Sequence, residues 1–150
     1  MITQEYLIEH RKLKRELLDE IKRLNYINLD KASIASPQVT GMPRGSSTGD
    51  PTANDAIKAS DQEAYVYSLK LKVDSCEHVI ESYVRRLSDE KYKQVIRLRY
   101  LSALDWDDVL IQMYGDKQNF YLKQESYKRR MYGVHRKAVD EILTLIEESL

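Results

Sequence analysis

The sequence predicts an all-α protein in which a long N-terminal helical hairpin precedes a C-terminal domain of three helices. Glycine and proline are scarce, at 5 and 3 of 150 residues, which argues against a turn-rich β-sandwich or β-barrel. Apolar residues recur at intervals of three and four along highly charged segments, as in amphipathic helices. In the second half of the chain, several segments also open with residues that favour a helix start.

The composition limits the class of protein further. Charged residues make up 32% of the chain and hydrophobic residues 42%, with 24 basic and 24 acidic residues, so we expect a core beneath a highly charged surface. No run of 18 apolar residues is present, so no membrane span is expected. The segment MITQEYLIEHRKLKRE lacks the apolar stretch of a secretory signal. Cys76 is the single cysteine, which excludes an internal disulfide and favours a reducing cytoplasm.

The first predicted domain, residues 1–29, contains a helix from Thr3 to about Asn28. Its apolar residues are four and three apart, a spacing that suits a helical hairpin or a short coiled coil. They are Leu13, Leu17, Ile21, Leu24 and Ile27. Two partners for this face remain open: another helix of the same chain, or the same helix of a second copy.

Residues 30–52 form the predicted connector. They include all three prolines and three of the five glycines, and this turn chemistry marks a break between helices. The segment is too long for a tight helix–helix turn. Its Gly-Ser-Ser-Thr-Gly stretch lacks the pattern of a phosphate-binding loop.

Residues 53–87 form the predicted long helix. It begins near Ala53, with Asp50 or Thr52 as N-cap and Pro51 in the first turn. We expect it to pair with the first helix through one apolar stripe. The stripe consists of Ile57, Tyr65, Leu69, Val73, Val79, Ile80, Tyr83, Val84 and Leu87.

Residues 88–150 form the predicted three-helix domain. For its first helix, Ser88 is the expected N-cap, with Leu87 and Tyr92 as a hydrophobic staple. For its second helix, Asp105 is the expected N-cap, with Leu104 and Val109 as the staple. That helix should end with Gly115 at the position after its last turn.

The last helix begins between Asn119 and Ser126 and runs close to the C-terminus. Its buried stripe consists of Met131, Val134, Ala138, Val139, Ile142, Leu145 and Ile146. Trp106 is expected to close the three-helix core. Gly133 is unexpected in mid-helix, where it costs about 1 kcal/mol relative to alanine, and it would permit a close backbone approach.

The basic charge is concentrated at the start of this last helix. Residues 117–137 hold seven Lys or Arg and one acid, Glu125, whereas residues 101–116 and 138–150 hold acids and no base. Tyr127 and Tyr132 lie among the basic residues. Basic and aromatic residues at a helix start are typical of a helix that enters the major groove of DNA. We therefore predict a helix-turn-helix in which 88–101 supports, 106–114 crosses the DNA backbone and 126–137 enters the groove.

Three segments resemble a known family. LSDEKYKQVIRLRYLSALDWDDVLIQM resembles the helix pair of sigma factor region 4-like domains, and RRMYGVHRKAVDEI resembles their closing segment. SPQVTGMPRGSSTGDPTANDAIK resembles the connector of small phage-encoded transcriptional regulators of the ArpU/RinA-like, sigma-70 region 4-like type. Together with the N-terminal helix and the long helix, these segments extend the resemblance over nearly the whole chain. The linker from Gly115 to Glu125 is longer than the family's turn.

The resemblance implies a sequence-specific DNA-binding regulator of phage or prophage late genes in the cytoplasm of a bacterial host. Its partners would be double-stranded promoter DNA, host RNA polymerase and a second copy in a homodimer. By position, the residues expected at bases and phosphates are Ser126, Tyr127, Lys128, Arg129 and Arg130. His135, Arg136 and Lys137 are expected further along, on the DNA backbone, and Lys123 and Tyr132 are also expected to bind DNA.

Two other functions remain open: a DNA-recognition subunit of a phage packaging machine, similar to a small terminase, and a helical module that binds polymerase or another protein. We expect no enzyme activity, because no nucleophile–base pair is recognisable. We expect no metal or cofactor either, because His10, His78 and His135 are far apart and lack ligand spacing. The tyrosines on apolar stripes should be core residues, and Cys76 a small packing residue. These tyrosines are Tyr65, Tyr83, Tyr92 and Tyr100.

Overall fold

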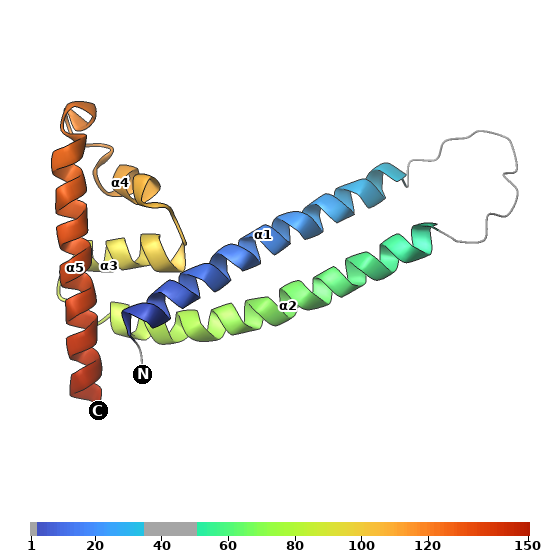
Figure 1. Cartoon of the computed structure of the whole chain (residues 1–150), viewed down its shortest axis with the longest axis horizontal. Coiled ribbons are helices and arrows are strands. Elements are labelled where there is room, and N and C mark those ends of the chain that lie inside the picture. The colour runs from blue at the N-terminus through green and yellow to red at the C-terminus, as the bar shows by residue number, and fades with distance from the viewer. Residues whose placement is uncertain (1–2, 35–50) are drawn as a thin grey trace, which may run out of the picture. The chain divides into compact units, whose positions relative to one another are not determined.

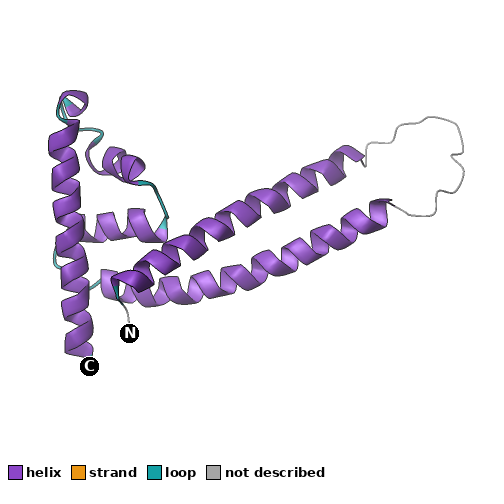
Figure 2. Cartoon of the chain, in the orientation of Figure 1, coloured by secondary structure: helices purple, strands orange, loops and turns teal. Residues whose placement is uncertain are grey.

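A computed structural model describes residues 3–34 and 51–150, and every regular element in these ranges is helical (Figures 1 and 2). The prediction of an all-α protein is confirmed. The long helices are α1 (Gln4–Ile34), α2 (Pro51–Val84) and α5 (Gln124–Ser149), and the short ones are α3 (Glu90–Ile96) and α4 (Trp106–Tyr114). A π-helical turn, η1 (Arg97–Leu101), follows α3, and a 3-10 turn, η2 (Phe120–Leu122), precedes α5.

The ends of the two long N-terminal helices differ from the prediction. α1 continues to Ile34 instead of ending near Asn28. α2 begins at Pro51, so Thr52 lies inside the helix and is not its N-cap, and it ends at Val84 instead of Leu87. Most of the predicted connector, residues 35–50 with Asp50, lies outside the described residues.

The chain divides into two compact units. Unit 1 consists of Met1–Arg15 and Lys72–Leu150, and unit 2 of Glu16–Leu71. Neither α1 nor α2 is interrupted at the division.

Unit 1 holds the main hydrophobic core. α3 lies against α5, and α4 packs beside both (Figure 1). The fully buried side chains include Leu7 of α1, Ile80 of α2, Ile96 of α3 and Met131 of α5. The predicted stripe of α5 faces this core, with Val134 and Leu145 at its edge and the other members buried.

The starts of α3 and α4 show how single residues set the helix boundaries. Asp89, not Ser88, is the N-cap of α3, since its carboxylate accepts a 2.8 Å hydrogen bond from the Lys91 backbone N–H. Ser88 instead donates its backbone N–H and its hydroxyl to Glu141, at 2.6 and 2.8 Å. A hydrophobic staple joins the residue before the N-cap to the fourth residue of the helix. With Asp89 as the N-cap, Leu87 and Tyr92 each lie one residue too early, so the predicted staple is wrong.

The start of α4 lies where it was predicted, with Asp105 at the N-cap position. Its carboxylate makes no capping bond, because it accepts from the guanidinium groups of Arg15 at 2.9 Å and Arg11 at 3.1 Å. At the other end, Gly115 caps α4 with φ −61°, so it does not have the left-handed conformation expected of a glycine after a helix.

In unit 2, segments of α1 and α2 run antiparallel. Gln62 donates to the backbone oxygen of Glu20 at 3.3 Å, and the Tyr65 hydroxyl donates to Glu16 Oε1 at 2.6 Å. Leu17 is buried, and the rest of the predicted α1 stripe is half-buried. The prediction of Tyr65 as a core residue is wrong, because 46% of it is exposed.

Within residues 3–34 and 51–150, no helix combines the length and the apolar character that crossing a lipid bilayer requires.

Candidate nucleic-acid interface

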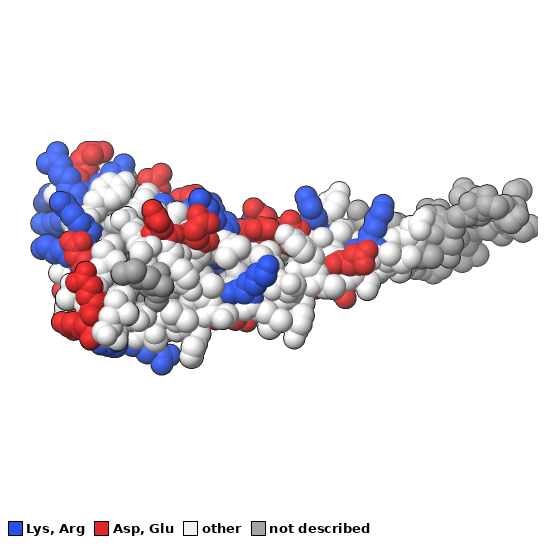
Figure 3. Space-filling view, turned by 60° about the horizontal axis from the view of Figure 1, so that its bottom comes forward, with Lys and Arg blue, Asp and Glu red and all other residues white. Residues whose placement is uncertain are grey.

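The first half of α5, with the residue before it, carries six basic side chains that we call the basic face. Within the described part of the chain, none of the six forms an ion pair, whereas Arg97 of η1 is paired with Glu81. Blue side chains gather over this part of unit 1 in Figure 3. Lys128 is half-buried and the other five are exposed. The basic face consists of Lys123, Lys128, Arg129, Arg130, Arg136 and Lys137.

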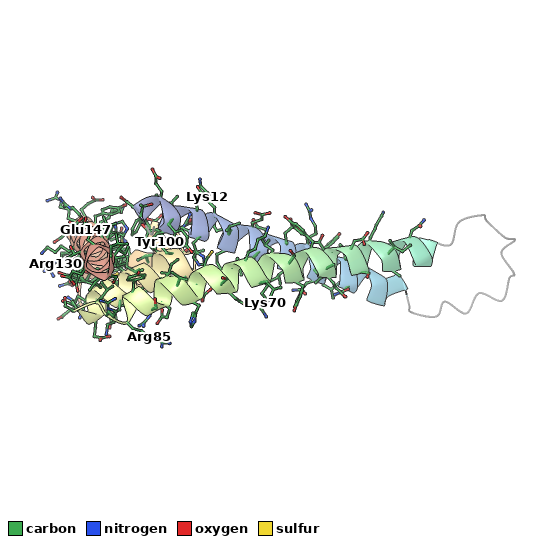
Figure 4. All side chains as sticks on the ribbon, turned by 90° about the horizontal axis from the view of Figure 1, so that it is seen from below. Lys12, Lys70, Arg85, Tyr100, Arg130 and Glu147 are labelled. Atoms are coloured by element: carbon green, nitrogen blue, oxygen red, sulfur yellow. The ribbon has the colours of Figure 1, made fainter. Side chains whose placement is uncertain are left out.

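Aromatic contacts anchor the start of α5. The ring of Tyr127 stacks on that of Tyr114 of α4, with centroids 5.1 Å apart and an interplanar angle of 25°. It also lies 6.0 Å from the ring of Phe120, which is buried in η2. Tyr127 was predicted to contact DNA, but its ring instead packs against α4 and η2 and positions the start of α5. The guanidinium of Arg130 lies 5.5 Å from the centroid of the Tyr127 ring, and Arg130 is at the outer edge of unit 1 (Figure 4).

A second aromatic contact holds the middle of α5. Trp106 of α4 packs edge-on against Tyr132 and His135, with centroid distances of 5.2 and 4.8 Å. The Arg99 guanidinium lies 4.3 Å from the centroid of the Trp106 ring. Trp106 thus packs against the core as predicted. Tyr132 remains 42% exposed at the edge of the basic face.

His135 is half-buried and faces the interior of unit 1. Its Nε2 is hydrogen-bonded to the hydroxyl of Tyr100 in η1 at 2.7 Å, and Figure 4 shows Tyr100 within the unit. Burial, with a smaller contribution from the positive charge of Arg99, lowers the pKa of His135 to about 4. The ring is therefore neutral at neutral pH and offers no positive charge to a phosphate. It follows the fully buried Met131 by one helical turn, which turns it towards the core.

The outward side of α5 is a row of residues three or four apart. Ser126, Arg129, Gly133 and Arg136 share this side, opposite Met131, and are exposed apart from the partly covered Gly133. A Cβ added at Gly133 would meet nothing within 4 Å. No described side chain therefore occupies the space that this glycine leaves. Gly133 is a gap in the centre of the basic face, with Arg129 four residues before it and Lys137 four residues after it.

The extended linker before α5 is ordered by η2. Asn119 takes a left-handed conformation, with φ 62°, and the chain then forms one 3-10 turn before α5 begins at Gln124. A pocket of about 280 Å³ lies between this turn and α4. Tyr121 and Leu122 are both 85% exposed beside the basic face. Leu122 was missed in the sequence because it ends a run of three residues, Phe120–Leu122, between polar segments, and so short a run has no helical repeat.

The arrangement suits a binding surface for an anionic polymer. Among residues 3–34 and 51–150, no group of three or more His, Cys, Asp or Glu side chains is placed to hold a metal ion. Comparison with family models, curated proteins and solved structures finds no match to this chain.

Proposed function

We propose that this protein is a sequence-specific DNA-binding transcriptional regulator that reads promoter DNA with α5. One observation carries the proposal: the first half of α5 presents cations without carboxylate partners among the described residues, while its inner side is fixed by Tyr127 and His135. Fixed cations on a rigid helix can match the phosphate spacing and the base edges of duplex DNA.

The proposed architecture is a helix-turn-helix formed by α4, η2 and α5, with α3 as the supporting helix. In this arrangement Ser126 and Arg129 face the base edges, because they lie on the outward row near the start of α5. Lys123, Lys128 and Arg130 flank the row and face phosphates. The partial positive charge at the start of α5 adds to this attraction.

Further along the helix, Arg136 and Lys137 are exposed and suited to backbone phosphates on the far side of the groove. Tyr132 can add an edge contact through its exposed part. Tyr127 and His135, in contrast, act as positioning residues that hold α5 against α4 and η1.

The resemblance to small phage-encoded regulators supports the more specific proposal that the target genes are late genes of a phage or prophage. It also supports host RNA polymerase as a partner, action in the bacterial cytoplasm and a homodimeric state. A DNA-recognition subunit of a packaging machine would use the same basic face, but it would assemble as a ring of many copies.

Fluorescence anisotropy tests the proposal on DNA fragments from around the protein's own gene and on scrambled DNA, over a series of salt concentrations. We expect one fragment to bind roughly 10³-fold more tightly than scrambled DNA. Six neutralised phosphates predict a slope of about −5 in log K against log salt. Equal affinity for all fragments would contradict the proposal.

Matched variants test the assigned residues. Arg129→Ala should weaken specific binding by about 1–3 kcal/mol, because Arg129 is assigned to a base. Arg130→Ala should weaken binding to all fragments alike and reduce the salt slope by about 1, because Arg130 is assigned to a phosphate. Helicity should be unchanged in both variants. Arg23→Ala, on α1 in unit 2, removes an exposed arginine whose ion pair among the described residues is with Glu20 in the same helix, and binding should not change. If all three variants bind as the parent does, the assignment of α5 is wrong. Light scattering separates a dimeric regulator from a packaging ring.

A further inference from the structure

Among its described residues, unit 2 exposes more large apolar side chains than it buries. Among its described side chains, the buried apolar ones are Leu17, Ala59 and Leu69. Seven large ones are exposed: Leu18, Tyr26, Leu29, Ile57, Tyr65, Tyr67 and Leu71. A pair of helices with so little interior is expected to need a further partner, because helices gain most of their stability from packing an apolar face.

The α2 segment of unit 2 is apolar on two opposite sides. Ala59 and Leu69 mark the buried side, where Gln62 contacts Glu20 of α1. The opposite side follows a spacing of three and four, which is the heptad pattern of a coiled-coil contact. We call this side the α2 seam, and all five of its residues are exposed: Ile57, Ser60, Ala64, Tyr67 and Leu71.

We infer that the α2 seam binds the α2 seam of a second copy of this chain, with the two helices antiparallel. Side-chain size favours this partner and this direction. In an antiparallel heptad register, Ala64 lies opposite the partner's Tyr67, and Ser60 opposite the partner's Leu71. Tyr67 and Leu71 then each pack against a smaller side chain, and the two-fold axis repeats both contacts. A parallel pair would place Tyr67 against Tyr67 and Ala64 against Ala64, which leaves crowding beside a void.

Charge favours the same direction. Glu63 and Lys70 are seven residues apart on one flank of the seam, and Lys70 extends from α2 into solvent (Figure 4). In the antiparallel register this flank lies beside the same flank of the partner helix. Glu63 then lies beside the partner's Lys70, and the two-fold symmetry produces two such pairs. In a parallel pair, Glu63 would lie beside the partner's Ser68. Neither charge has an ion-pair partner among the described residues.

This surface differs from the dimer face considered in the sequence, which was the stripe of Leu13, Leu17 and Ile21 in α1. Leu17 is buried, so that stripe is already used within the chain. The inference does not depend on DNA binding, since it concerns unit 2 alone.

Sedimentation equilibrium of the full chain tests the inference. The seam spans about two heptads, so we expect a dimer with a Kd on the order of micromolar, as is usual for small interfaces. Tyr67→Lys should weaken dimerisation roughly tenfold or more, because it places two charges in the seam. Tyr26→Lys is the matched control: Tyr26 is 68% exposed against 64% for Tyr67, but it lies on α1, away from the seam.

A charge exchange tests the direction of the helices. Glu63→Lys or Lys70→Glu alone should weaken the dimer several-fold, since each places like charges together, and the double variant should restore the parent Kd. Loss of dimerisation without restoration in the double variant would overturn the antiparallel register. A chain that is monomeric at all concentrations, or one weakened equally by Tyr26→Lys, would overturn the proposed surface. Circular dichroism confirms that each variant remains helical.

Discussion

The burial of His135 makes the stability of unit 1 dependent on pH. His135 is held neutral in the folded chain, because burial lowers its pKa to about 4. In the unfolded chain its pKa returns to about 6.5. As the pH falls through 6.5, the unfolded chain therefore takes up a proton that the folded chain does not accept until about pH 4. The free energy of unfolding must decrease across this window.

The magnitude follows from the two pKa values. For one histidine with these values, proton linkage lowers the free energy of unfolding by about 2 kcal/mol between pH 7 and pH 5. His135 is only partly buried, and solvent screening reduces the effect, so we expect a decrease of about 1–2 kcal/mol. Most carboxyl groups titrate below this window and contribute little to it.

Urea unfolding at pH 7 and pH 5 measures the decrease. His135→Gln keeps a polar side chain near the Tyr100 hydroxyl but removes the titrating ring, so the difference between the two pH values should shrink by about 1–2 kcal/mol. His10 is also buried, with its pKa lowered by burial, and its contribution should remain in this variant. His78→Gln, at an exposed position, is the matched histidine-to-glutamine control. The reasoning is refuted if His135→Gln and the parent lose the same stability on acidification.

Three further substitutions have defined outcomes. Gly133→Ala should raise the free energy of unfolding by about 1 kcal/mol, because the added Cβ meets nothing within 4 Å. It should lower DNA affinity in the anisotropy assay, because DNA would occupy that gap. A gain in both stability and DNA affinity would contradict this. Asp89→Ala removes the cap on Lys91 and should lower stability by about 1 kcal/mol in urea. Phe120→Ala empties the site beneath Tyr127 and should cost about 3–5 kcal/mol, so a cost below 1 kcal/mol would show that η2 does not anchor α5.

Helix boundaries were predictable where one residue had no competitor. Asp105 is marked as the N-cap of α4 by the staple pair Leu104 and Val109 around it, and the helix begins directly after it. At α3, Ser88 and Asp89 are adjacent and both suit an N-cap. The choice depends on Glu141, which lies 53 residues away and binds Ser88. Local sequence contains no information about that contact.

The basic face was predictable from charge, whereas the roles of its aromatic neighbours were not. Lysine and arginine are rarely buried without a partner, so an excess of them implies exposure. Tyrosine and histidine suit both surface and interior. Tyr127 stacks on Tyr114, and His135 is hydrogen-bonded to Tyr100. Both contacts are made to other helical elements, so the sequence around α5 does not reveal them.

The errors in α2 have one cause, which also supports the inferred dimer. The predicted stripe joined Ile57 and Tyr65 to Leu69, as if the helix had a single apolar side. Leu69 lies on the buried side, whereas Ile57 belongs to the seam on the opposite side and is 59% exposed. A helix that contacts one neighbour needs one stripe, and a second stripe with heptad spacing is expected only where a second helix covers it. Among the described residues, α1 accounts for the first stripe of α2, and the second stripe is the surface that we propose a second copy covers.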